Sequence, residues 1–238
     1  APPSRNRLLK LVRLAVQGLP LGFVLDRPRR PVVLAEGLDR AHPATLLMLG
    51  LNLVALARQP GMLADADRYC LRLGSLVRLG LSAAVQKRDY LRDHRPRAGV
   101  DVTRGFLLDR ARVVVCPVGL DEVVQQFTGW SMSTGGASLD LGKQIVRRLD
   151  DVLRQDSRVA QMDACLDGPF SFHLDSERLP SREQVAGLTA WDDRAGPGQQ
   201  LRITSVLHAL AEQGTLALFL PRESQLGEEQ IADILEQA

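Results

Sequence analysis

The sequence predicts an α/β fold, because segments typical of buried strands alternate with segments of helical periodicity. The segment ARVVVCPVG at residues 111–119 is a continuous apolar run, typical of a strand covered on both faces. The longest helical pattern spans residues 62–92, with apolar residues three or four positions apart. At 238 residues and 45% hydrophobic content, the chain can bury a sizeable core. No internal repeat is present, so we expect a single α/β domain over residues 1–238.

The first part of the chain predicts one helix and three short strands. Residues 5–17 have a helical apolar stripe, and we separate residues 1–20 as an amphipathic N-terminal helix from residues 21–238. GFVLD (22–26) and PVVLA (31–35) have the pattern of short buried strands around the turn RPRR. Residues 46–56 predict a buried strand that leads into a helix.

The long helix at 62–92 has one predicted buried face and one basic face. Its apolar stripe is Leu63, Ala66, Cys70, Leu73, Val77, Leu81, Ala84 and Leu91. The basic residues expected outside the stripe are Arg68, Arg72, Arg78, Lys87 and Arg88. Proline and glycine then predict a loop over 93–105.

The elements after the central strand follow from the same patterns. Ser138 is the predicted N-cap of a helix over 139–155, with Asp140 in its first turn. We expect Ile145, Leu149, Val152 and Leu153 to be its buried stripe. The other predicted elements are a helix at 120–127, a strand at 170–174, a polar loop at 176–200, a helix at 201–212, a strand at 215–220 and a helix at 228–236.

Charge and composition exclude several classes of function. With 30 basic and 28 acidic residues, the net charge of +2 gives no strong field for nucleic acid or an acidic membrane. No apolar run approaches the ~18 residues typical of a membrane helix. Three cysteines without a close pair form no disulfide framework, so a reducing cytoplasm is the simplest location. The chain lacks an initiator methionine, so we expect the native start to lie upstream.

The candidate chemical groups each have a structural alternative. Gly135 and Gly136 could hold a phosphate on backbone amides, but the segment lacks the lysine and spacing of a P-loop, and a plain loop explains it too. Cys116 ends a strand and is either a reactive or a buried structural thiol. We place Cys70 in the core and Cys165 in an exposed loop. The four histidines lack metal-ligand spacing.

One polar loop offers acid–base groups. His42 could act as an acid or base, or lie hydrogen-bonded at the surface. Glu36 and Asp39 could form a carboxylate pair or serve as turn formers.

The order of several short motifs resembles a known family. LGLNLVALA is followed by a long Arg-rich helix ending in KRDYL, then by RVVVCPVGLDEVV, LGKQIVRRL and GTLALFLPRE. This series resembles the C-terminal half of the glycyl radical enzymes, most closely the anaerobic (class III) ribonucleotide reductases. The counterparts of the family's NLPR-like, GLNEA-like and late-strand motifs would be Asn52–Leu53, 119–122 and 214–223. The resemblance implies a half-barrel-like mixed sheet packed by long helices.

The departures from the family concern its catalytic residues. The loop that should carry the thiyl cysteine, AEGLDRAHPA, contains no cysteine, and Val54 and Ala55 replace the proline and arginine of the NLPR motif. The late-strand histidine, the Cys-rich zinc site and the radical glycine motif are also missing up to Ala238. The resemblance therefore implies a degenerate or incomplete relative that binds a ligand or a partner subunit. Two alternatives stay open: an active radical enzyme whose cysteine and glycine lie on another chain or segment, and an unrelated α/β binding domain.

The resemblance also indicates where a ligand would bind. The cavity would lie at strand ends, and Asn52 would be a buried amide near the barrel centre. A nucleotide is the family-based ligand, although another small molecule, self-association or a partner subunit would also fit. No metal ligand and no cofactor can be named. The expected lining residues are Glu36, Asp39, His42, Asn52, Cys116, Gly119, Asp121 and Glu122.

Overall fold

The computed structural model describes residues 4–16, 23–24, 45–93, 108, 111–166, 187–188, 195–211, 215–216 and 227–237. In chain order its elements are α1 (Arg5–Val16), β1 (Phe23–Val24), β2 (Thr45–Asn52), α2 (Leu53–Ala57), α3 (Ala66–Asp93), β3 (Arg112–Val118), α4 (Leu120–Thr128), the 3-10 helix η2 (Met132–Thr134), α5 (Gly136–Val159), β4 (Asp163–Leu166), α6 (Pro197–His208), β5 (Thr215–Leu216) and α7 (Glu228–Gln237). The predicted α/β class is confirmed. The strand predicted at 31–35, the loop at 93–105 and the strand at 170–174 lie outside the described residues.

The main sheet has three parallel strands in the order β2-β3-β4. Each strand therefore lies beside its neighbour in the chain, with α3 connecting the first two strands and α5 connecting the second two. The resemblance predicted a mixed sheet, but the three strands that the structure describes in this sheet are all parallel. The antiparallel strands β1 and β5 instead form a separate pair.

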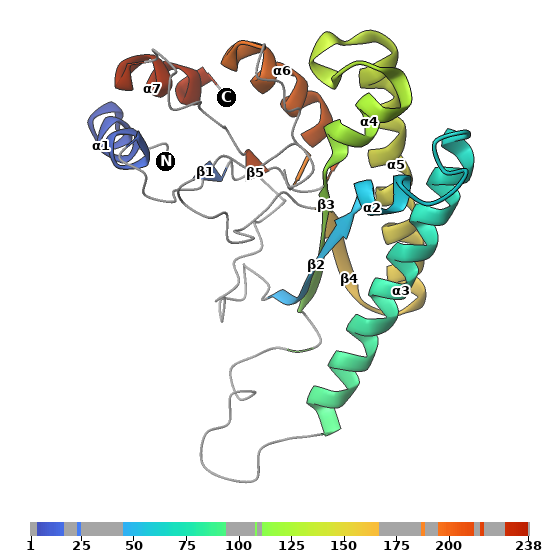
Figure 1. Cartoon of the computed structure of the whole chain (residues 1–238). Helices are drawn as coiled ribbons and strands as arrows, with labels where there is room; N and C mark the ends of the chain where they lie inside the picture. Colours follow the sequence, from blue (N-terminus) through green and yellow to red (C-terminus); the bar gives the residue numbers. More distant parts are fainter. Residues whose placement is uncertain are drawn as a thin grey trace.

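Long helices cover one face of this sheet. Figure 1 shows α3 and α5 on the same side of the three strands. Side chains alternate along a strand, and every second one joins the large core cluster beneath these helices. We call this the helix-covered face; its buried residues are Leu51, Val113, Val115, Ala164 and Leu166.

The opposite face, which we call the second face, carries the other half of each strand. Met48 pairs with Val114 and Gly50 with Cys116, while Val114 also pairs with Cys165. Met48, Val114 and Cys165 form a small apolar cluster of their own. The sheet therefore separates a large helix-covered core from a face that includes two thiols.

The long helix α3 begins four residues after the predicted position, at Ala66. Asp65 explains the start, because its carboxylate accepts hydrogen bonds from the amides of Asp67 (2.8 Å) and Arg68 (3.2 Å). Leu63 precedes the helix and is exposed rather than part of the buried stripe.

Two further α3 residues refine the prediction for its faces. Arg88 was expected outside the buried stripe, but it packs against the end of α5. Its guanidinium donates to the carbonyls of Ala160 (3.2 Å) and Gln161 (2.9 Å). Tyr69 is fully buried and donates to the Leu53 carbonyl at 3.0 Å. Burial raises the pKa of its hydroxyl.

The helix α5 also begins earlier than predicted. Gly135 is its N-cap, and both Gly135 and Gly136 have positive φ, at 76° and 57°. Ser138 is not the cap but a buried first-turn residue whose hydroxyl lies 3.3 Å from that of Thr128. A left-handed glycine pair therefore replaces the expected serine cap. The predicted stripe of Ile145, Leu149, Val152 and Leu153 is confirmed as buried.

The strand β4 was not predicted. Cys165 lies in it and is buried, so its placement in an exposed loop was wrong. Cys70 is buried as expected, and the burial of Cys116 favours the structural alternative for that thiol.

The helices at the two ends of the described chain pack on each other. α1 and α7 bury Leu8, Val12, Ile231 and Ala232 in a separate small cluster (Figure 1). Exposed ion pairs surround this cluster, including Arg13 with Glu228 at 2.9 Å. The Arg13 hydrogen bond lowers the pKa of the Glu228 carboxyl.

Candidate functional site

The carboxyl ends of β2 and β3 bring together five of the eight residues predicted from the sequence. Asn52 is the last residue of β2 and pairs in register with Val118, the last residue of β3. Cys116, Gly119, Asp121 and Glu122 lie on β3, the following turn and α4. The remaining three, Glu36, Asp39 and His42, lie outside the described residues.

Asn52 is a helix cap rather than a buried amide. Its side-chain oxygen accepts a hydrogen bond from the Ala55 amide at 2.8 Å, which caps α2. Asn52 is exposed, so the expectation of burial was wrong. An amide within an apolar run is explained here by the change from strand to helix.

Gly119 makes the turn from β3 into α4. Its φ of 78° lies in the left-handed region, and its carbonyl accepts from the Val123 amide at 3.1 Å as the helix begins. Gly187 approaches the same end of the sheet and donates to the Pro117 carbonyl at 2.7 Å. The end of β3 is thus a crowded backbone junction.

Asp121 anchors the loop that follows α4. It is 2% exposed, and its carboxylate accepts hydrogen bonds from the Ser131 hydroxyl (2.9 Å) and the Met132 amide (2.7 Å). Such bonds compensate the cost of burying a carboxylate. Gln199 joins the same loop by donating to the Ser133 carbonyl at 2.6 Å. Asp121 therefore positions the loop, which α6 also contacts through Gln199.

Glu122 lies one residue further along α4 and is only partly buried. Its carboxylate accepts a hydrogen bond from the Gln126 side-chain amide at 2.9 Å, one helical turn later. This hydrogen bond joins two successive turns at the surface of α4.

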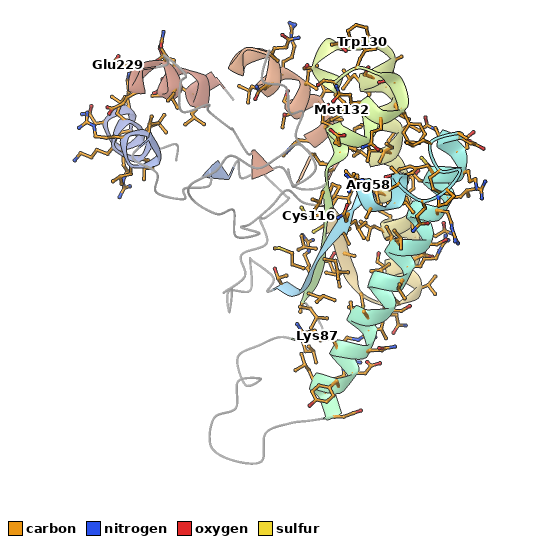
Figure 2. All side chains as sticks on the ribbon, viewed as in Figure 1. Arg58, Lys87, Cys116, Trp130, Met132 and Glu229 are labelled. Carbon is orange, nitrogen blue, oxygen red and sulfur yellow. The ribbon has the colours of Figure 1, made fainter. Side chains whose placement is uncertain are left out.

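Cys116 lies on the second face, at the centre of the described sheet. Figure 2 places its side chain on β3, away from α3. The thiol is fully buried and lies 3.6 Å from the Pro117 carbonyl. Its in-register neighbour on β2, Gly50, is exposed. The second face is therefore accessible from the β2 side, directly beside a buried thiol.

Sequence reasoning missed Gly50 and Cys165 as members of this face. A glycine inside an apolar strand is a recognised signal for the close approach of another group. That signal was available in TLLMLGLN, the sequence of β2. Cys165 could be assigned to the face only after β4 was known.

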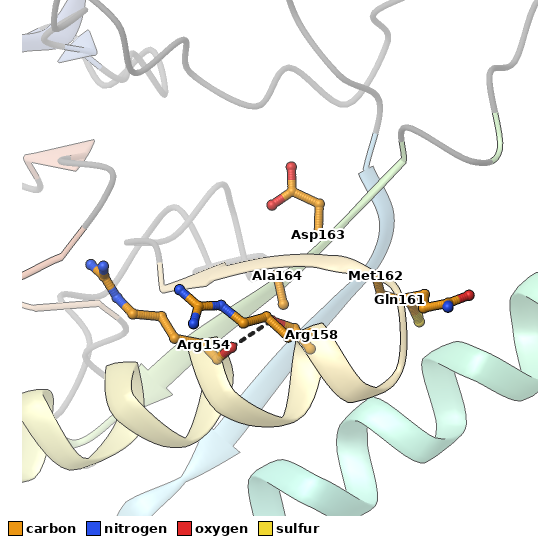
Figure 3. A pocket seen from close by; sticks show the side chains of 7 residues that line it. Arg154, Arg158, Gln161, Met162, Asp163 and Ala164 are labelled. Carbon is orange, nitrogen blue, oxygen red and sulfur yellow. Dashed lines mark hydrogen bonds between the residues drawn. The ribbon is translucent and has the colours of Figure 1, made fainter.

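A hollow of about 360 Å³ lies at the other end of the sheet, between the end of α5 and the start of β4 (Figure 3). Arg154 and Arg158 extend over it from α5. The charges of Arg154 and Asp163 are already compensated, because Arg154 pairs with Asp150 at 2.6 Å and Asp163 pairs with Arg112. The C-terminus of α5 also disfavours an anion there. This hollow therefore carries no functional assignment.

Other kinds of site find no support in the described residues. Among them, no group of three or more histidine, cysteine, aspartate or glutamate side chains could hold a metal ion. Within the same residues, no helix has the length and apolar character needed to cross a membrane.

Comparison with known proteins leaves the family open. The sequence matches no protein-family model, and no curated protein shows significant similarity to it.

Proposed function

We propose that this chain is a non-catalytic relative of the glycyl radical enzymes, of the anaerobic ribonucleotide reductase type. In this proposal it binds a small-molecule ligand or a partner subunit at the carboxyl ends of β2 and β3. The site comprises the accessible β2 side of the second face, with Gly50 and Asn52 at its surface.

The observation that carries the proposal is the arrangement of the parallel strands. Strands that are consecutive in the chain lie side by side, and both connecting helices cover one face. A (β/α) barrel is built from this arrangement, with its helices outside and its ligand site at the carboxyl ends of the strands. In such an arrangement the second face corresponds to the interior.

The edge strand supports the binding of a partner. Among the described strands β2 has a neighbour on one side alone, and Leu47, Met48 and Leu49 are only half-buried along it. An edge with partly exposed apolar side chains is a template for a further strand. A second half of a barrel, on the same or another chain, would supply such a strand.

The cysteines favour binding over radical chemistry on this chain. The sequence has three cysteines, and all three are buried. The resemblance places the thiyl cysteine in a loop, whereas Cys70 lies in α3 and Cys116 and Cys165 lie within strands. A displaced thiol does not meet the substrate hydrogen in the geometry that the reaction requires. Burial also raises the pKa of Cys70. Catalysis would require a cysteine from another chain or segment.

Two measurements test the proposal. Calorimetric titration of the full chain with a panel of ribonucleoside di- and triphosphates tests for a small ligand. The native mass of the protein, purified without oxygen, tests for a co-purifying chain. We expect saturable binding of a nucleotide or a stoichiometric partner chain; the absence of both overturns the proposal. A partner that carries a cysteine loop and a radical glycine would instead support the alternative, a divided radical enzyme.

A further inference from the structure

The outward face of α3 has an unusual composition for a solvent-exposed surface. Leu71, Leu79 and Tyr90 are 61%, 68% and 60% exposed. The buried residues of α3, such as Cys70, Leu73, Val77, Leu81 and Ala84, lie on the opposite side of the helix and face the sheet and α5. The exposed apolar residues therefore belong to a surface that the described chain leaves uncovered.

A regular seam runs along the centre of this outward face. Its residues are spaced alternately by four and three positions, the spacing of a coiled-coil seam. All of them are exposed. In chain order the seam is Arg68, Arg72, Ser75, Leu79, Ser82, Gln86, Asp89 and Asp93.

The seam is self-complementary when read in the opposite direction. Its N-terminal end carries two arginines and its C-terminal end two aspartates. In an antiparallel pair of identical helices, with the two-fold axis passing between positions 80 and 81, Arg68 lies opposite Asp93 and Arg72 opposite Asp89. Every charged residue of the seam thus meets an opposite charge on the other copy.

The uncharged residues follow the same symmetry. Leu79 lies opposite Ser82, and Ser75 opposite Gln86, near the axis. Leu71 and Tyr90 lie on opposite flanks of the seam. Small side chains at the centre allow the two helices to approach closely, so that Leu79 of each copy packs beside Ser82 of the other. A two-fold interface requires such self-complementarity, in which residue i meets j and j meets i.

We propose that two copies of this chain associate through antiparallel α3 helices, with this seam at the interface. This inference does not depend on the proposed function, because α3 covers the face of the sheet opposite to the proposed site. The 28 residues of α3 span about 42 Å, which is long enough for the whole seam to pair. A single helix pair lies at the small end of specific interfaces, so we expect a reversible dimer of micromolar affinity.

Charge reversal provides the sharpest test. Arg72→Asp places aspartate opposite Asp89 twice in the dimer, and Asp89→Arg places arginine opposite Arg72 twice. Each variant alone should dimerise at least tenfold more weakly than the wild-type chain. Mixed together, the two variants should form a heterodimer, because both contacts then join opposite charges. Within one chain the two positions are 17 residues apart and cannot compensate each other.

The measurement is sedimentation equilibrium of the full chain across the micromolar concentration range. Arg147→Asp, at an exposed position of α5, is the matched charge control and should dimerise like the wild type. Leu79→Glu should abolish the dimer, whereas Val159→Glu, at another highly exposed apolar position, should not. Circular dichroism checks that each variant folds. The proposal is overturned if the wild-type chain is monomeric throughout, or if its dimer is insensitive to the α3 variants.

Discussion

The two faces of the parallel sheet differ in what holds them and in what they offer to other molecules. On the helix-covered face, Val113, Val115 and Leu166 are at most 1% exposed and pack under α3 and α5. On the second face, two thiols and a small apolar cluster lie beside the exposed Gly50. Val114, Cys116 and Cys165 on the second face are also at most 2% exposed, so this face is accessible at its β2 side, at Gly50 and Asn52. The comparison teaches that the larger core lies under the helices, while the exposed positions of the sheet lie at the β2 side of the second face.

The largest effect should come from truncating the helix-covered face. Leu166→Ala removes a fully buried side chain from the main core, and we expect it to lower the free energy of unfolding by about 2–5 kcal/mol. The adjacent Cys165→Ala, on the second face, removes one methyl-sized group and should cost about 1 kcal/mol. Urea denaturation of both variants measures the contrast. Part of this contrast follows from the smaller number of atoms that Cys165→Ala removes; a cost as large as that of Leu166→Ala would contradict the greater contribution of the helix-covered face.

The next effect concerns the buried carboxylate at the carboxyl end of the sheet. Asp121→Ala leaves the buried donors on Ser131 and Met132 without their acceptor, and should cost about 2–3 kcal/mol. Asp140→Ala is the matched control, because Asp140 is exposed and its ion pair with Lys143 lies at the surface. Chemical denaturation should show almost no change for the control. A similar small cost for Asp121→Ala would contradict its anchoring role.

A smaller effect is expected for Asn52. Asn52→Ala removes the cap of α2, which should cost about 1 kcal/mol of folding free energy. Asn52→Ser retains a capping oxygen and should recover most of this loss. If Asn52 also contacts a ligand, both variants weaken nucleotide binding beyond their effect on stability. Thermal melting with and without nucleotide separates the two roles.

The smallest effect concerns an exposed carboxylate, in contrast to the buried Asp121. The pKa of Glu228 is lowered by its hydrogen bond to Arg13, so the ionised form favours the folded state. This contribution is present above the ordinary pKa of 4.5 and is lost as pH falls through the lower folded-state value. The protection of α7 amides against hydrogen exchange, corrected for the intrinsic pH dependence of exchange, should therefore decrease on acidification. In Glu228→Gln the exchange should already be faster at neutral pH and lack this acid-dependent step.

The strongly patterned elements could be predicted from the sequence. β2 and β3 are apolar runs, and α3 and α5 have periodic apolar stripes. Each of these patterns is long enough to identify its element. β4 was missed because four residues after a long helix are too few for a periodic pattern. The start of α5 was misplaced because Ser138 is a good cap by composition, whereas the turn uses left-handed glycines.

The candidate site could be predicted only in part. Asn52, Cys116 and Gly119 meet at the ends of β2 and β3, as the order of the motifs suggested. The roles of Asn52 and Asp121 could not be predicted, because a cap and a loop anchor depend on hydrogen bonds made after the turns form. Gly50 was missed because its importance comes from its register with Cys116.

Nucleotide titration of Gly50→Val tests most directly whether the second face is the binding surface. Valine is favoured in strands, and Gly50 is an exposed residue of β2 in register with Cys116, so we expect the fold to remain while the site is blocked. Gly198→Val, at an exposed position of α6 with open space around it, is the matched control. We predict that Gly50→Val loses at least tenfold in affinity with an unchanged melting temperature, whereas Gly198→Val binds like the wild-type chain. Equal affinities for all three proteins, or no binding by the wild type, would contradict a nucleotide site on this face.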